Sequence, residues 1–216
     1  MLIIFDLDGT LIDSSRDLAI SVNATREYLD KPPLDPLLIH SYVGNGAAML
    51  VRRSLGPGVT DEMADRGLAY FLKYYRAHAL QHTRCYDGVP ELLRELADAG
   101  HRLAILTNKP AKISVDIVAG LGLSGYFFRV YGGDSLFAKK PDPEGIRLLM
   151  EEACEPSGAT LMVGDSAVDV QTARNAGVRC CGVSWGIQPE SFELNPPDFL
   201  IQSPRELLME LEANAQ

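Results

Sequence analysis

The spacing of hydrophobic residues along the chain divides it into three stretches of different character. Residues 2–5 (Leu-Ile-Ile-Phe) form a continuous apolar run of β-forming residues, which is typical of a strand buried on both faces. From Ser14 to about Leu80 apolar residues recur at helical spacing, and no strand pattern interrupts them. From Cys85 onward, short apolar runs alternate with helical segments.

The second stretch predicts a small unit built of helices alone. We expect these helices near residues 18–29, 36–41, 47–55 and 61–79. The first of them ends at the Lys-Pro-Pro of residues 31–33. In the last, Tyr70, Phe71, Tyr74 and Tyr75 share one side. An aromatic stripe of this kind favours the core of a helix bundle over a binding surface.

The third stretch predicts strands that alternate with helices. We expect strands over residues 102–106, 127–131, 160–163, 178–183 and 199–201, with helices between them and a final helix from Pro204. Such alternation is typical of βαβ units and of a parallel sheet. The prediction is therefore an α/β fold. Its sheet comes from residues 1–13 and 82–216, and the helical unit of residues 14–81 is inserted after the first strand.

Composition and charge narrow the class of protein. A hydrophobic content of 46% and a charged content of 23% are ordinary for a globular protein of one medium domain that carries an insertion. The net charge of -9 argues against binding to a nucleic-acid backbone, which needs a basic face. No stretch approaches the roughly 20 apolar residues of a membrane span. No basic and hydrophobic leader precedes the first strand.

The cysteines carry no metal-binding pattern. Cys85, Cys154, Cys180 and Cys181 show neither a Cys-x-x-Cys spacing nor a companion histidine cluster. We expect them to be buried free thiols, as in a protein of the reducing cytoplasm.

Candidate chemistry begins where the first strand ends. Asp6 and Asp8 follow it directly, and Gly9 permits a turn. Two like charges this close repel each other, and a hard cation such as Mg²⁺ between them would relieve the repulsion. A solvated Asp-Gly turn remains open for so short a motif, whereas a calcium loop does not fit the position after a buried strand. Asp13 or Ser14 caps the helix that follows.

Other polar residues also follow predicted strands, and ligands of open α/β sheets bind at that edge. Thr107 and Asn108 come after residues 102–106, and Asp165 and Ser166 after residues 160–163. Taken alone, the first pair is equally typical of a helix cap. Asp169 lies one helical turn beyond Asp165, where a second carboxylate can brace the first.

Four motifs in sequence order resemble those of the haloacid dehalogenase superfamily of phosphotransferases. They are Asp-x-Asp-Gly-Thr at 6–10, the strand-end Thr107, Lys140 before proline, and Gly-Asp-x-x-x-Asp at 164–169. The resemblance covers essentially the whole chain. It is close to the phosphoglycolate phosphatase branch, which shares the runs at residues 43–46, 107–109 and 133–143. This resemblance implies a Rossmann-like core, residues 1–13 and 82–216, covered by a helical cap domain, residues 14–81.

The resemblance also implies roles for the two N-terminal carboxylates. Asp6 would attack phosphorus to form an aspartyl-phosphate, and Asp8 would protonate the leaving alkoxide and then deprotonate water. Mg²⁺ would be held by an Asp6 oxygen, the Asp8 backbone carbonyl and the Asp165 carboxylate. The expected activity is that of a Mg²⁺-dependent phosphatase.

The remaining motif residues would bind phosphate or support the groups that do. Lys140 would place a positive charge on the phosphate oxygens, Thr107 a hydroxyl and Asn108 a backbone N–H. Of the two lysines before Pro141, Lys140 is chosen because the family's lysine directly precedes the proline. Ser166 and Asp169 would orient Lys140 or a metal-bound water.

The hypothesis for the substrate is 2-phosphoglycolate, whose carboxylate needs a partner from the cap. The turn Gly44, Asn45 and Gly46 could supply backbone donors at a helix N-terminus, and Arg52 or Arg53 could supply charge. That these arginines are merely solvated helix residues stays equally open.

Three alternatives also remain. The first is a phosphatase for pyrophosphate, a nucleotide or a sugar phosphate. The second is a sugar phosphomutase, and the least favoured is a non-catalytic binding module. The only partner implied is a small phosphorylated metabolite, with no nucleic acid and no membrane, for a monomer or a homodimer in the cytoplasm.

Overall fold

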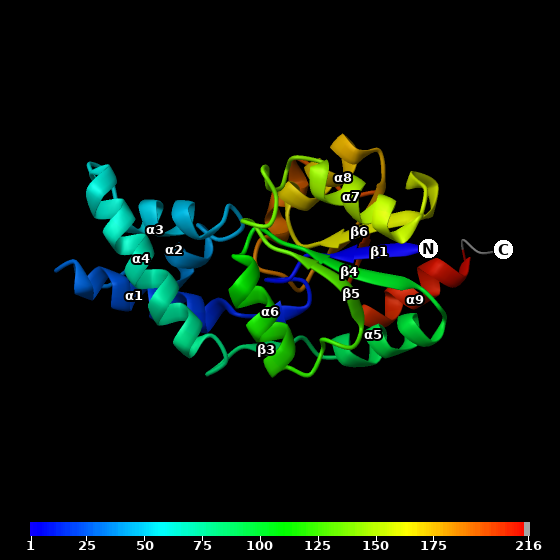
Figure 1. Cartoon of the computed structure of the whole chain (residues 1–216), viewed down its shortest axis with the longest axis horizontal. Coiled ribbons are helices and arrows are strands. Elements are labelled where there is room, and N and C mark those ends of the chain that lie inside the picture. Colours follow the sequence, from blue (N-terminus) through cyan, green and yellow to red (C-terminus); the bar gives the residue numbers. More distant parts are fainter. Residues whose placement is uncertain (214–216) are drawn as a thin grey trace.

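A computed structural model describes residues 1–213, and a six-stranded parallel sheet organises it (Figure 1). In spatial order its strands are β5 (Phe127–Tyr131), β4 (Arg102–Leu106), β1 (Leu2–Phe5), β6 (Thr160–Gly164), β7 (Arg179–Val183) and β8 (Phe199–Ile201). The strand β1 lies between β4 and β6, with Leu2 paired to Arg102 and to Thr160. Burial on both faces explains its unbroken apolar run. The predicted Rossmann-like α/β fold is confirmed.

Helices cover both faces of this sheet (Figure 1). One face carries α5 (Val89–Asp98), α6 (Ala111–Gly120) and α9 (Pro204–Ala213), and the other carries α7 (Glu144–Ala153) and α8 (Ala167–Ala176). Ile3 and Phe5 of β1 pack into the first of these cores and Leu2 and Ile4 into the second, as the two-residue repeat of a strand requires.

Four helices form the end of the molecule opposite the N-terminus, and we call them the cap (Figure 1). They are α1 (Ser15–Tyr28), α2 (Pro36–His40), α3 (Ala47–Leu55) and α4 (Asp61–His78). The chain enters the cap after β2 (Ile12–Asp13) and returns at β3 (Arg84–Cys85), and these two strands pair antiparallel. Neither was predicted, because a strand of two residues is too short to show a periodicity.

The two connections between sheet and cap are tied together by Asp17, in the first turn of α1. Its buried carboxylate accepts hydrogen bonds from the backbone N–H groups of His82 and Thr83 and from the Thr83 hydroxyl, at 2.9–3.1 Å. The start of the first cap helix is thereby fixed to the segment that leaves the last.

The start of α1 shows which of Asp13 and Ser14 caps the helix, a choice that the sequence left open. Ser14 occupies the N-cap position, but its hydroxyl donates to Asp8 and makes no capping bond. The carboxylate of Asp13 accepts the N–H of Ser15 instead, at 3.0 Å.

All four cysteines are free thiols. Cys180 and Cys181 are buried in β7 and Cys85 is half-buried, but Cys154 is exposed just after α7. The prediction of a buried thiol is wrong for Cys154, because this residue ends a surface helix. Within residues 1–213, no helix combines the length and the apolar character needed to cross a membrane.

Candidate active site

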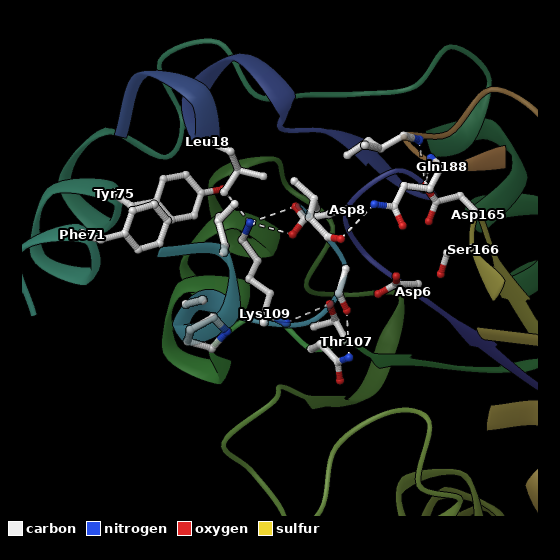
Figure 2. Close-up of a pocket in the computed structure, with 18 residues that line it drawn as sticks. Asp6, Asp8, Leu18, Phe71, Tyr75, Thr107, Lys109, Asp165, Ser166 and Gln188 are labelled. Carbon is white, nitrogen blue, oxygen red and sulfur yellow. Dashed lines mark hydrogen bonds and ion pairs between the residues drawn. The ribbon is translucent and has the colours of Figure 1, made fainter. Parts of the chain in front are cut away.

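Three carboxylates meet at the carboxyl ends of β1 and β6. Asp6 follows β1, Asp165 follows β6, and Asp169 lies in the first turn of α8. Because the two strands are adjacent and parallel, their ends lie side by side. All three residues are buried, and one carboxylate oxygen of each lies within 4.8 Å of the others. Figure 2 shows Asp6 and Asp165 beside Ser166 in this cluster.

A buried lysine enters the same cluster from the loop before α7. Lys140 Nζ lies 3.0 Å from Asp6 Oδ1 and 2.6 Å from Asp169 Oδ1. The second oxygen of Asp169 accepts the backbone N–H and the hydroxyl of Ser166, at 3.1 and 2.7 Å, which caps α8. Both oxygens of Asp169 are therefore engaged, one by Lys140 and the other by Ser166.

Burial and the nearby negative charges raise the pKa values of carboxylates in the cluster. Burial raises the pKa of Asp6 to about 6, and Asp169 adds to the rise while Lys140 opposes it. Burial, together with Asp169 and Asp6, holds the pKa of Asp165 well above its ordinary value. Among its described residues, the cluster thus holds three carboxylates and one ammonium group, that of Lys140, which contacts Asp6 and Asp169.

The donor set of the cluster fits a small divalent cation. Asp6 Oδ1 is occupied by Lys140 and the Leu7 N–H, and Asp165 Oδ2 accepts the N–H groups of Ile187 and Gln188. The other oxygen of each accepts no hydrogen bond from residues 1–213. Carboxylate oxygens that cluster within 4.8 Å of one another in excess negative charge are hard ligands of the type that Mg²⁺ prefers.

Two glycines let the backbone close around Asp165. Gly9 has a φ of +82°, and a Cβ there would lie 2.1 Å from Asp165 Oδ2. A Cβ on Gly186 would lie 2.2 Å from the Cβ of Asp165. The absence of side chains brings the Asp-x-Asp-Gly turn and the loop after β7 against the same carboxylate.

Asp8 lies on the cap side of the cluster and is held by its own partners (Figure 2). Lys109 Nζ donates to both of its carboxylate oxygens, at 2.8 and 2.9 Å, and the Ser14 hydroxyl donates to Oδ1. Lys109 also donates to the Tyr75 hydroxyl at 2.5 Å. Burial alone lowers the pKa of Lys109, but Asp8 and Tyr75 outweigh it and the pKa is raised. The lysine is therefore cationic.

Thr107 and Asn108 lie at the carboxyl end of β4, where they were expected, and both are buried. Asn108 Nδ2 donates to the Gly44 carbonyl at 2.9 Å and to the Lys140 carbonyl at 3.0 Å. It thereby joins a turn of the cap to the lysine loop. Thr107 Oγ1 accepts the Lys109 N–H at 3.3 Å.

A cavity lies between the cap and the ends of the strands, and most of these groups line it, although Lys140 and Asp169 do not (Figure 2). The sheet side supplies polar groups, and the cap side supplies apolar walls. The lining residues are Asp6, Asp8, Leu18, Val43, Gly44, Gly46, Ala47, Leu50, Phe71, Tyr75, Thr107, Asn108, Lys109, Pro110, Asp165, Ser166, Ile187 and Gln188.

The aromatic stripe of α4 has two faces. Phe71 and Tyr75 are buried and line the cavity, whereas Tyr70 and Tyr74 are only half-buried and stack in line on the outside. The prediction of bundle core is confirmed for Phe71 and Tyr75 and is wrong for Tyr70 and Tyr74. Tyr75 also reaches the site, where its hydroxyl accepts a hydrogen bond from Lys109.

The cap residues proposed from the sequence are only partly brought to the cavity. Gly44 and Gly46 line it, and the Asn45 carbonyl accepts a hydrogen bond from Lys139 at 2.9 Å. Arg52 pairs with Asp61 at 2.7 Å on the outside of the cap, and Arg53 is exposed. Among residues 1–213, neither arginine lines the cavity.

Sequence reasoning missed several groups of the site. Lys109 carried a signal, since it belongs to the Thr-Asn-Lys run, but no role was assigned to it. Tyr75 was visible only as an aromatic in a stripe. Ile187 and Gln188 bind Asp165 through backbone N–H groups, which any residue has, so nothing in the sequence marked them.

Comparison with known proteins agrees with this geometry. Residues 3–183 match the family model described as haloacid dehalogenase-like hydrolase. The phosphoglycolate phosphatase of Vibrio vulnificus (strain CMCP6) is 39% identical over 216 residues, which cover 96% of this chain and 94% of that protein. The phosphoglycolate phosphatase of Pseudomonas savastanoi pv. phaseolicola is 40% identical over 190 residues, 86% of this chain and 70% of its own.

Solved structures show the same architecture. A predicted phosphoglycolate phosphatase from Haemophilus somnus 129PT superposes with a TM-score of 0.92 at 30% identity, over 97% of each chain. A predicted phosphatase from Clostridium acetobutylicum superposes with a TM-score of 0.86 at 26% identity, over 98% of each chain.

Proposed function

This chain belongs to the haloacid dehalogenase-like hydrolases and is a phosphatase, and from that premise we propose that it hydrolyses 2-phosphoglycolate to glycolate with Mg²⁺. The observation that carries the proposal is the Asp6 carboxylate, buried at the end of β1 and facing the cavity in contact with Lys140. The substrate is suggested by the relatives that bear the name phosphoglycolate phosphatase.

Asp6 is the proposed nucleophile. Lys140 and the Leu7 N–H fix one of its oxygens, which orients the carboxylate, and the positive charge of Lys140 favours the ionised form that attacks. In the first step an Asp6 oxygen bonds to phosphorus as the bond from phosphorus to the glycolate oxygen breaks. The product of that step is an aspartyl-phosphate.

Asp8 is the proposed acid and base. Its carboxyl group lines the cavity two residues beyond Asp6 and gives its proton to the departing glycolate oxygen. In the second step Asp8 takes a proton from water, the water oxygen bonds to phosphorus, and the bond to Asp6 breaks. Asp6 returns as a carboxylate and inorganic phosphate leaves.

Lys140, the Thr107 hydroxyl and the Asn108 N–H are the proposed donors to the phosphate oxygens. Asp6, the Asp8 backbone carbonyl and Asp165 would hold Mg²⁺, with Ser166 and Asp169 in support. Bound Mg²⁺ would supply positive charge that offsets the repulsion between the phosphate and the carboxylates.

The cap, as the separate domain of residues 14–81 over the core, is the proposed source of specificity. The turn of Gly44, Asn45 and Gly46 reaches the cavity just before α3, and the free N–H groups at that helix start suit the carboxylate of the substrate. Because neither Arg52 nor Arg53 lines the cavity, we assign no role to them here.

Phosphate release from a panel of small phosphoesters tests the proposal. With Mg²⁺, 2-phosphoglycolate should be preferred, and the Asp6→Asn variant and a chelator should each reduce turnover to background. A strong preference for another ester would retain the chemistry and reject the substrate. No turnover of any ester by the wild-type protein would reject the chemistry.

A further inference from the structure

A line of polar contacts runs from the cap to the carboxylate of Asp8 (Figure 2). It begins at the Tyr75 hydroxyl on α4, passes through Lys109 Nζ and ends on both oxygens of Asp8. The Lys109 ammonium also lies 4.5 Å from the centre of the Tyr75 ring. The lysine comes from the segment between β4 and α6, so the line joins two parts of the chain that pack across the cavity.

We propose that Lys109 and Tyr75 are positioning residues that hold the Asp8 carboxylate in its working orientation while α4 covers the site. The inference rests on the proposed function, in which Asp8 exchanges a proton with the leaving group and with water. Neither residue needs to touch the reacting atoms for this role.

The burial of Lys109 argues that its contacts are specific. Its side chain is only 3% exposed, and a buried ammonium group is costly unless it is paired and hydrogen-bonded. Within residues 1–213, its ammonium group contacts only Asp8 and Tyr75. Loss of either Asp8 or Tyr75 would leave the buried ammonium group poorly compensated. Lys109 is therefore expected to keep its contacts with both residues.

Tyr75 is tightly packed, so its hydrogen bond with Lys109 depends on the position of α4. The residue is 1% exposed and its ring packs on Phe71, at 5.4 Å between ring centres. Its hydroxyl cannot move away from Lys109 unless the helix moves with it. Burial also raises the pKa of Tyr75 to about 12, so the group stays a neutral phenol.

The orientation of Asp8 matters because proton transfer requires a carboxyl oxygen to lie within hydrogen-bonding distance of the leaving oxygen. Lys109 bonds to both oxygens of Asp8, and Ser14, at the entry to the cap, bonds to one of them. With the lysine removed, only the Ser14 contact remains to restrain the carboxylate among the described residues. An Asp8 carboxylate held by that single contact would lose much of its catalytic contribution.

The test compares esters that differ in their need for a proton. Departure of glycolate requires protonation by Asp8, whereas p-nitrophenol leaves as a stable anion. The measurement is kcat/KM with Mg²⁺ for 2-phosphoglycolate and for p-nitrophenyl phosphate, since this ratio reports the steps up to phosphorylation of Asp6.

Lys109→Met should lower kcat/KM for 2-phosphoglycolate by about 10²-fold, and the loss for the aryl ester should be several-fold at most. Tyr75→Phe keeps the ring and should cost roughly tenfold on 2-phosphoglycolate. The controls are Tyr74→Phe, on the outer face of the same helix, and Lys112→Met, exposed on α6. Both control variants should leave kcat/KM for the two esters unchanged. Thermal unfolding of each variant checks that it is folded.

A second measurement separates positioning from direct binding of the substrate. In single turnovers of 2-phosphoglycolate with enzyme in excess, Lys109→Met should cost little once Asp8→Asn is present, because the lysine acts through Asp8. A full additional loss in that background would mean that Lys109 binds the substrate itself and would overturn the inference. Equal losses for both esters would also overturn it. A wild-type protein that hydrolyses neither ester would reject the proposed function and this inference with it.

Discussion

At the scale of single residues, the buried carboxylates of the site outnumber the positive charges that contact them. Lys140 contacts Asp6 and Asp169, while Lys109 forms an ion pair with Asp8. Asp165 has only backbone N–H groups as described partners. Burial raises the pKa values of Asp6 and Asp165, and the neighbouring carboxylates add to the rise.

Mg²⁺ binding should therefore weaken in acid. The cation requires ionised carboxylates, and without metal the pKa of Asp6 is about 6. Below pH 6, protons compete with the metal, so affinity should fall by up to tenfold for each pH unit and each proton displaced. Titration calorimetry between pH 5 and 8, in buffers of different ionisation enthalpy, should show proton release on binding near pH 6. An affinity that stays constant over this range would contradict the prediction.

At the scale of elements, the joint between sheet and cap depends on short pieces with long-range partners. The strands β2 and β3 have two residues each and are stabilised by pairing across 12–13 and 84–85. Beside them, Asp17 bonds to two backbone N–H groups and one hydroxyl of residues 82–83. A buried carboxylate with this many donors fixes the path of the chain more firmly than the pairing of two short strands does.

Replacement of Asp17 should destabilise the whole protein. Asp17→Ala leaves the N–H groups of His82 and Thr83 without their acceptor and should lower the free energy of unfolding by about 3 kcal/mol. Urea unfolding measures the change. The matched control is Asp65→Ala, which removes an exposed carboxylate from α4 and should stay within about 0.5 kcal/mol of the wild type. Equal stability of the two variants would show that the joint is held by other contacts.

At the scale of the whole molecule, the cap contacts the core around the cavity through one turn as well as through Tyr75. Three carbonyls of residues 43–45 accept hydrogen bonds, from Gln188 at 3.0 Å, Asn108 at 2.9 Å and Lys139 at 2.9 Å. All three donors belong to loops that follow or precede core elements. These bonds favour the arrangement in which the cavity is covered. The oligomeric state and the cytoplasmic location stay predictions.

Loss of a donor to this turn should weaken substrate binding more than chemistry. Gln188→Ala and Lys139→Ala each remove one bond to the turn, worth about 1 kcal/mol, and should raise KM roughly fivefold with little change in kcat. Steady-state kinetics with 2-phosphoglycolate measure both constants, with Lys112→Ala as the exposed control. A fall in kcat at constant KM would show that these residues act on the chemical step instead.

The sequence by itself determined the class of fold and the residues at the strand ends. A continuous apolar run, helical spacing and their alternation are local properties, and they predicted the parallel sheet and the inserted helices. Motif order then pointed to Asp6, Asp8, Thr107, Lys140 and Asp165. Four of these residues line one cavity, and Lys140 contacts Asp6. Their chemical roles remain proposals.

Only the tertiary structure decided which other groups join them. Lys109 meets Asp8 across 101 positions of sequence and Tyr75 across 34, and no local periodicity encodes such pairs. The same holds for the N–H groups of Ile187 and Gln188 on Asp165, because backbone donors carry no residue-specific signal. Packing of the cap also placed Arg53 outside the cavity. Local sequence patterns show which face of an element is buried, but which side chains meet there depends on how the elements pack.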